Sequence, residues 1–248
     1  MRTSALHKVT GYLVMAAIIC LAPAVFGSVQ SGQASKSTQP NPNANQFGEL
    51  SGAWWQWIFS FPSSTSPNFS NGLVDCSSGQ DTHTRSNQIW FLAGSFGGPA
   101  DRTCTTPIPR GISLFFPLLN IAYDNINACD STTPPTTYGV QQLKQLAAAA
   151  QDNPQELHAS VDGVPVPAYR AHSQVFSYTL PATDNFYQHF GCTVPGVNWP
   201  STTSFPVVSD GYWVMLENLS PGPHVVKYGG IGNNGFSVDI TYHLTVAP

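Results

Sequence analysis

Charge is scarce in this sequence, and no basic cluster is present. Charged residues make up 9% of the chain, with nine Lys and Arg against thirteen Asp and Glu, which gives a net charge of −4. A soluble domain ordinarily has about a quarter charged residues, so Ser, Thr, Asn, Gln and Gly must form much of this surface. Without a basic patch, the sequence argues against nucleic acid or an anionic membrane surface as a partner.

The common catalytic signatures are missing as well. The chain has no G-x-S-x-G elbow, no H-E-x-x-H, no P-loop, and no dinucleotide-binding glycine motif in a strand–helix setting. A Ser-His-Asp site could still be assembled from distant residues, because such sites are defined by geometry. The sequence therefore leaves open whether the protein is an enzyme, and the cofactor is likewise unknown.

No apolar run near the N-terminus is long enough to span a bilayer comfortably. Residues 12–22 are apolar, follow the basic residues Arg2 and Lys8, and lead into the small residues Ala22-Pro23-Ala24. This pattern is typical of a cleaved secretory signal peptide. We expect a signal peptide at residues 1–24, with a second possible cleavage site at residues 25–27. A retained membrane anchor is the less favoured alternative.

The rest of the chain divides into a spacer and one folded part. Residues 25–46 are rich in Ser, Gln, Asn and Pro and cannot bury enough apolar surface to fold, which indicates a flexible linker. Residues 47–248 are expected to form a single secreted domain without a stable membrane anchor after signal cleavage.

Four cysteines follow the expected cleavage site: Cys76, Cys104, Cys129 and Cys192. An even number in an exported protein favours two disulfides. We favour Cys76–Cys104 with Cys129–Cys192 because each pair closes a contiguous segment, although the sequence allows three pairings. No C-x-x-C pair is present, which disfavours a cysteine metal site.

Hydrophobic periodicity predicts a mostly β domain with two helices. A short aromatic helix is expected at residues 47–59 and a longer one at about residues 138–151, capped by Thr136 or Thr137. Loops are expected at residues 63–88 and 193–206, and a tight turn at Asp162-Gly163. Short strands are expected at residues 89–93, 112–119, 157–161, 164–169, 175–180, 211–217, 224–228 and 236–246. Closely spaced strands with Gly/Pro turns predict an antiparallel β-sandwich or jelly roll.

Several segments are distinctive: WWQW (54–57), WFLAG (90–94), FFPLLN (115–120), DGYWVML (210–216) and LSPGPH (219–224). Together they resemble a family of uncharacterised secreted bacterial proteins, and the likeness spans most of the mature chain. That family has no assigned activity, so the resemblance implies no catalytic residues. The closing strands also resemble those of extracellular Ig-like β-sandwiches, which concerns the fold alone.

Carboxylates and histidines give weak candidates for chemistry. Glu49, Asp210 and Glu217 could serve as catalytic acids, although Glu49 equally fits the first turn of a helix. A metal site on the rim of the sandwich would use histidines from neighbouring strands. The candidates are His172, His189, His224 and His243, and His243 is expected to face solvent.

Aromatic and amide side chains support a different hypothesis. Neutral ligands such as glycans stack on flat rings while their hydroxyls find polar partners. Trp199 in a polar loop is the best stacking candidate, with Trp54, Trp57 and Gln56 as further ligand-binding candidates. Three tryptophans in four residues are more often core. The sequence thus favours a protein that binds a neutral ligand, possibly a glycan, over an extracellular hydrolase or a structural surface protein.

Overall fold

The computed structural model of the protein describes residues 43–80, 88–125, 137–191 and 203–248. The expected signal peptide, most of the linker, Cys129, Cys192 and Trp199 lie outside these ranges. Within them, no helix has the length and apolar character needed to cross a membrane.

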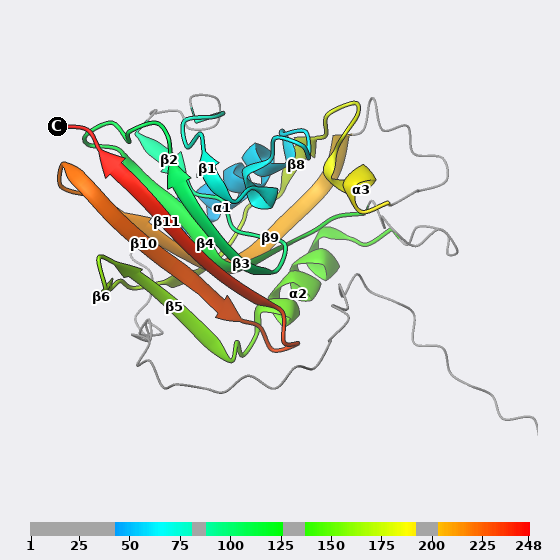
Figure 1. Ribbon diagram of the computed structural model, residues 1–248. Coiled ribbons are helices and arrows are strands. Elements are labelled where there is room, and N and C mark those ends of the chain that lie inside the picture. Colours follow the sequence, from blue (N-terminus) through cyan, green and yellow to red (C-terminus); the bar gives the residue numbers. More distant parts are fainter. Residues whose placement is uncertain (1–42, 81–87, 126–136, 192–202) are drawn as a thin grey trace, which may run out of the picture.

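Two mixed β-sheets pack face to face, as expected for a β-sandwich (Figure 1). The six-stranded sheet has the order β1-β3-β11-β10-β5-β6, and the five-stranded sheet has the order β2-β4-β9-β7, with β8 paired to β9. The strands of the first sheet are β1 (Gly72–Val74), β3 (Gly98–Cys104), β11 (Ser237–Val246), β10 (Gly222–Ile231), β5 (Glu156–Val161) and β6 (Val164–Pro165). Those of the second are β2 (Ile89–Phe91), β4 (Ser113–Tyr123), β9 (Thr203–Leu216), β7 (Tyr169–His172) and β8 (Phe176–Thr179). The helices of the described residues are α1 (Ala44–Phe59), the 3-10 turn η1 (Pro67–Phe69), α2 (Val140–Gln151) and α3 (Phe186–His189).

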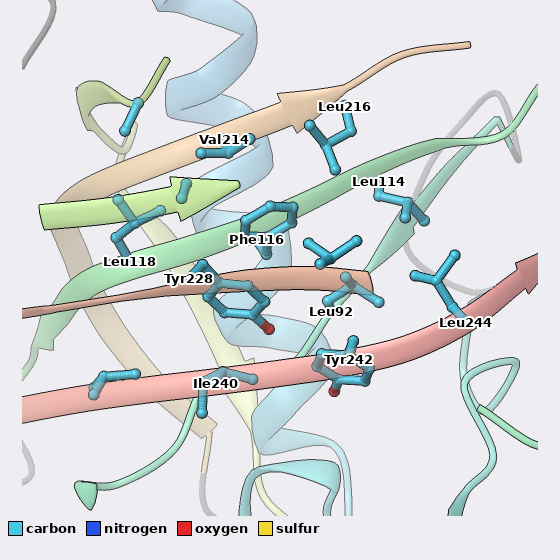
Figure 2. Packing of buried hydrophobic residues seen from close by; sticks show 14 of the residues in the cluster. Leu92, Leu114, Phe116, Leu118, Val214, Leu216, Tyr228, Ile240, Tyr242 and Leu244 are labelled. Carbon is cyan, nitrogen blue, oxygen red and sulfur yellow. The ribbon is translucent and has the colours of Figure 1, made fainter. Parts of the chain in front are cut away.

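The main core lies between the two sheets, where strand alternation supplies one face from each. Phe116 and Val214 are cross-strand partners of β4 and β9 and point toward Tyr228 and Tyr242 of the other sheet (Figure 2). Strand β11 contributes every second residue, and Val238, Ile240, Tyr242, Leu244 and Val246 are buried. This is the alternation expected from the sequence for residues 236–246.

Helix α1 covers the outer face of the five-stranded sheet. The alternate residues of β4 and β9, Phe115 and Trp213, are fully buried against Phe47 and Trp54 of α1. Both faces of β4 and β9 are therefore covered, and both strands read as nearly continuous apolar runs. Helix α2 contacts β4 and β9 through Leu143 and Ala147.

Several sequence-based expectations need correction. The prediction that a loop extends to residue 206 is wrong, because β9 begins at Thr203, where its backbone pairs with β8. The expected loop at residues 63–88 contains β1, and β3 was missed. Strand β3 escapes detection because Arg102 occupies one of its inward positions and breaks the apolar alternation. Three strand pairs are parallel, so the sheets are mixed rather than purely antiparallel.

Two helix details also differ from expectation. Helix α1 begins at Ala44, so Glu49 lies beyond the first turn and is exposed there. The N-cap of α2 is Gly139, which makes no side-chain capping bond, so Thr137 is not the cap. The turn at Asp162-Gly163 is confirmed, with positive φ at both residues as a tight hairpin requires.

The disulfide Cys76–Cys104 is confirmed. It ties the end of β3 to the turn that follows β1. The second expected disulfide, Cys129–Cys192, lies outside the described residues.

Candidate functional site

The tryptophans of α1 belong to the core. Trp54 and Trp57 are 1% and 4% exposed, and their indole N–H groups donate to the carbonyl oxygens of Leu92 (2.9 Å) and Ser78 (3.2 Å). Gln56 is exposed and donates to the carbonyl oxygen of Ser177. The structure thus places the two tryptophan candidates under the surface and leaves Gln56 on it.

Aromatic rings do reach the surface beside α3. Five residues from three segments form this aromatic surface: Phe69, Phe96, Phe186, His189 and Phe190. The ring of His189 is stacked on Phe69, with 4.1 Å between centroids. Phe96 contacts both Phe69 (5.0 Å) and Phe186 (4.6 Å). The four phenylalanines are half-buried and His189 is exposed.

Arg102 holds two of the three segments in place. Its side chain is fully buried, and its guanidinium donates to the carbonyl oxygens of Ser70 (2.8 Å), Ala93 (2.6 Å) and Gly94 (2.8 Å). Ser70 follows Phe69 in the chain, and Gly94 precedes Phe96 by two residues. A buried cation bonded to the backbone of both loops therefore fixes the spacing of their rings.

A capping box and a buried tyrosine hold helix α3 in place. Asn185 and Gln188 form a capping box that closes its single turn. The hydroxyl of Tyr187 contacts that of Tyr178 (2.8 Å), and both donate to the carboxylate of Asp124. Burial raises the pKa of both tyrosines well above 10, so they remain protonated donors. This anchor leaves Phe186, His189 and Phe190 to form the surface.

Polar residues precede two of the segments that bear these rings. Asp184 precedes α3, and hydrogen bonds from the hydroxyl and amide of Ser64 lower the pKa of its carboxyl. Asn68 is buried beside Phe69 in the chain, and its Oδ1 atom has no hydrogen-bond partner among the described residues. Buried acceptors are nearly always paired, so Asn68 is an exception among the described residues.

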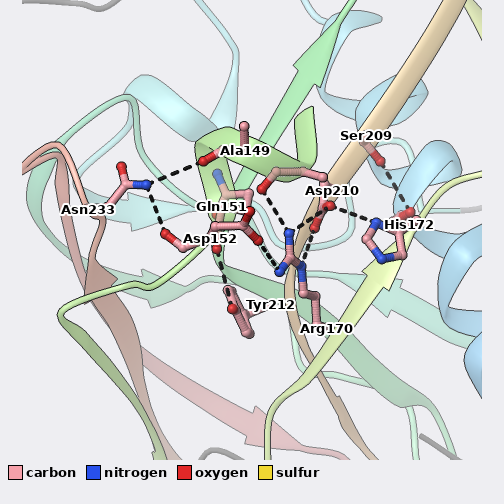
Figure 3. A network of polar contacts seen from close by, with 11 residues as sticks. Ala149, Gln151, Asp152, Arg170, His172, Ser209, Asp210, Tyr212 and Asn233 are labelled. Carbon is pink, nitrogen blue, oxygen red and sulfur yellow. Dashed lines mark hydrogen bonds and ion pairs between the residues drawn. The ribbon is translucent and has the colours of Figure 1, made fainter. Parts of the chain in front are cut away.

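A second candidate site brings together Asp210 and His172, two residues that the sequence suggested separately. The Asp210 side chain is 1% exposed and receives two hydrogen bonds from Arg170, at 3.0 and 3.1 Å (Figure 3). The Nδ1 atom of His172 lies 2.6 Å from the same carboxylate, while the His172 side chain is 63% exposed. The buried carboxylate therefore orients an imidazole whose Nε2 atom points away from it.

The same network joins α2 to the sheet. Arg170 also donates to Asp152 (2.7 Å) and to the carbonyl oxygen of Ala148 (2.9 Å) at the end of α2. Asn233 donates to the carbonyl oxygens of Ala149 and Asp152 (Figure 3). These bonds satisfy carbonyl groups that a helix C-terminus leaves open, which gives the network a structural role of its own.

The other candidates do not join either site. Glu49 is exposed on α1, and Glu217 is exposed just after β9. His224 pairs with Asp162, and His243 pairs with Asp101 and is 46% exposed, facing solvent as expected. Among the described residues, no group of three His, Cys, Asp or Glu side chains could hold a metal ion.

Sequence reasoning missed the phenylalanines of the aromatic surface because they come from three distant segments. Only one local signal was present. Asn185 and Gln188 have the spacing of a capping box, and this places Phe186 and Phe190 on neighbouring positions one turn apart.

Comparison of the chain with protein-family models, curated proteins and solved structures finds no match. Function is therefore inferred from the two sites themselves.

Proposed function

We propose that the protein is an exported β-sandwich that binds a neutral ligand with an apolar face, such as a glycan, on the aromatic surface of Phe69, Phe96, Phe186, His189 and Phe190. The observation that carries the proposal is the firm placement of these rings by Arg102 and by the Asp124–Tyr187 contact. Rings held before the ligand arrives lose little entropy on binding. The scarcity of charge suits an uncharged ligand.

Export remains part of this proposal. The disulfide Cys76–Cys104 is compatible with an oxidising compartment, and the resemblance to secreted bacterial proteins points the same way. Trp199 remains a proposed additional stacking residue.

Retention on insoluble and soluble polysaccharides tests the proposal. We expect Phe69→Ala and His189→Ala to weaken binding by about fivefold to tenfold each, because each removes a stacking ring. Matched controls are Phe205→Ala, which removes a phenylalanine 69% exposed on β9, and His243→Ala. The controls should bind like the unmodified protein. If no polysaccharide is retained, or if all four variants bind alike, the glycan proposal is wrong.

One observation favours a hydrolase as the second candidate. In His172 the Nδ1 atom is held by the buried carboxylate of Asp210, which fixes the tautomer whose Nε2 can accept a proton. A screen of ester and glycoside substrates, comparing His172→Ala with His243→Ala, tests this candidate. Hydrolysis lost only in His172→Ala would support it, and hydrolysis equal in both would remove it.

A further inference from the structure

His224 lies near the start of strand β10, between a turn within the six-stranded sheet and the turn that connects the five-stranded sheet to it. One is the tight turn of Asp162 and Gly163 between β5 and β6, and the other is the Ser220-containing turn between β9 and β10. The His224 side chain is 9% exposed, whereas the Asp162 side chain is 49% exposed. The imidazole is therefore enclosed, while its carboxylate partner remains accessible to water.

Both ring nitrogens of His224 face oxygen acceptors. Nδ1 lies 2.7 Å from Oδ2 of Asp162, and Nε2 lies 2.8 Å from the carbonyl oxygen of Ser220. A neutral imidazole carries a hydrogen on only one nitrogen. It would leave a lone pair facing either a carboxylate or a carbonyl oxygen at hydrogen-bond distance. The imidazolium satisfies both contacts.

The neutral ring has one alternative partner. The hydroxyl of Ser220 lies 3.4 Å from Nε2, and a hydroxyl can donate as well as accept. On deprotonation, Nδ1 could keep its hydrogen bond to Asp162 while Nε2 exchanges the carbonyl of Ser220 for its hydroxyl. The hydrogen bond to Asp162 would then join a carboxylate to a neutral ring instead of an imidazolium, which weakens the contact between the β5–β6 turn and the start of β10.

We propose that His224, Asp162 and Ser220 form a proton-dependent clasp, which fastens the β5–β6 turn to the start of β10 when His224 is protonated and loosens when it is neutral. The backbone takes part directly. The amide of Val225 donates to Oδ1 of Asp162 (2.8 Å), and the amide of Asp162 donates to the carbonyl oxygen of Val225 (2.9 Å). The carboxylate thus closes the end of the β5–β10 ladder.

Asp162 is the charged group that acts on His224 among the described residues. The cross-strand partner of His224 on β11 is the apolar residue Leu244, and its contact in the β9–β10 turn is the uncharged residue Ser220. Burial acts to lower the pKa of His224, but the hydrogen bonds to Ser220 and Asp162 outweigh it and raise this pKa above 6.5. The hydrogen bond from Val225, followed by that from His224, lowers the pKa of Asp162 below 3.8.

The two directions define a pH window. The raised pKa of His224 adds stability that is complete below 6.5 and is lost as pH rises through the folded-state value. The lowered pKa of Asp162 adds stability that is complete above 3.8 and is lost as pH falls through its folded-state value. The clasp is therefore fastened most firmly between 3.8 and 6.5.

Nuclear magnetic resonance of the full disulfide-bonded protein tests the clasp. We expect two imidazole N–H signals for His224 in the window and a titration midpoint above 6.5. We also expect the protection factor of the Val225 amide, corrected for intrinsic exchange, to fall several-fold from about pH 5 to about pH 8. Asp162→Asn, a change at an accessible side chain, should lower the midpoint and reduce the change in protection.

His224→Gln should make the Val225 protection independent of pH, because glutamine does not titrate. His243→Gln, which alters an exposed histidine paired with Asp101, should leave the pH dependence intact. If His224 carries a single N–H throughout the window, the clasp is disproved. It is also disproved if the protection of Val225 varies equally in the unmodified protein and in His224→Gln.

Discussion

Arg102 is the residue on which the aromatic surface depends most directly. It is the fully buried cation among the described Lys and Arg residues, and none of the described carboxylates bonds to it. Its charge is stabilised by three carbonyl oxygens, by the hydroxyl of Tyr242 at 3.2 Å, and by the face of that ring at 5.3 Å. Such a planar fork of donors matches several fixed acceptors at once.

Replacing Arg102 with lysine is expected to lower the free energy of unfolding by about 2–4 kcal/mol. Lysine keeps the charge but cannot reach carbonyls of both loops, which leaves buried acceptors unpaired. Urea unfolding measures the loss. The matched control is Arg110→Lys at an exposed arginine, which should change stability by less than about 0.5 kcal/mol. Equal stability of the two variants would mean that the carbonyls do not need the guanidinium.

Individual residues show what a sequence can and cannot reveal. The burial of Trp54, Trp55 and Trp57 follows from their crowding on one short helix, and the outward direction of His243 follows from strand alternation. The contact between His172 and Asp210 could not be foreseen, because it depends on the antiparallel register of β7 against β9. The hydrophobic pattern indicates which face of a strand is buried, but it does not identify which residues of two strands distant in the chain become partners.

At the scale of elements, the polar network of Arg170 and Asp210 acts as the attachment of α2. This helix has only two buried apolar residues, Leu143 and Ala147. Its C-terminal carbonyls are instead held by Arg170, by Asn233, and by the hydroxyl of Tyr212 on the carbonyl of Gln151. A helix with so small an apolar contact requires these bonds to stay docked.

We expect Asp210→Ala to cost about 3 kcal/mol, because it leaves the partly buried guanidinium of Arg170 without its main partner. Loosening should be greatest in α2, which hydrogen exchange of its amides would detect. The control is Asp239→Ala, whose side chain is 70% exposed beside His158; it should cost less than about 0.5 kcal/mol. If α2 exchanges no faster in Asp210→Ala than in the control, the network does not hold the helix.

Elements with strong periodicity were predicted well, and those defined by their neighbours were not. The amphipathic helix α1 and the alternating strand β11 have clear patterns in the sequence. Strands β1 and β3 are short or polar, and they exist because each finds a parallel partner across the sheet. The first residues of β9 likewise become a strand through pairing with β8.

For the molecule as a whole, the fold class followed from composition and turn spacing, whereas the mixed strand order did not. Nothing in the spacing of strands indicates that β3 lies between β1 and β11, because no tight turn joins any two of these strands in the chain. The arrangement has a consequence for stability. Strand β1 is a three-residue edge strand with Leu73 77% exposed, so its apolar burial contributes little to holding this edge.

The disulfide Cys76–Cys104 compensates for that weak edge. It joins residues 28 positions apart, and closing a loop of this length stabilises the folded state by about 3–4 kcal/mol through the unfolded chain. We expect the double variant Cys76→Ser, Cys104→Ser to melt roughly 10 °C lower than the unmodified protein. Paired substitution is preferable to a reducing agent, since reduction would also break the Cys129–Cys192 bond expected from the sequence.

The double variant should also lose hydrogen-exchange protection first at Thr105, whose amide donates to the carbonyl oxygen of Val74 (2.9 Å). Protection in β10 and β11, in the centre of the same sheet, should persist until global unfolding. This order of loss would locate the effect of the bond at the β1–β3 edge. A drop in melting temperature with uniform loss of protection would instead mean that the bond stabilises only by restricting the unfolded chain, and that the edge is held without it.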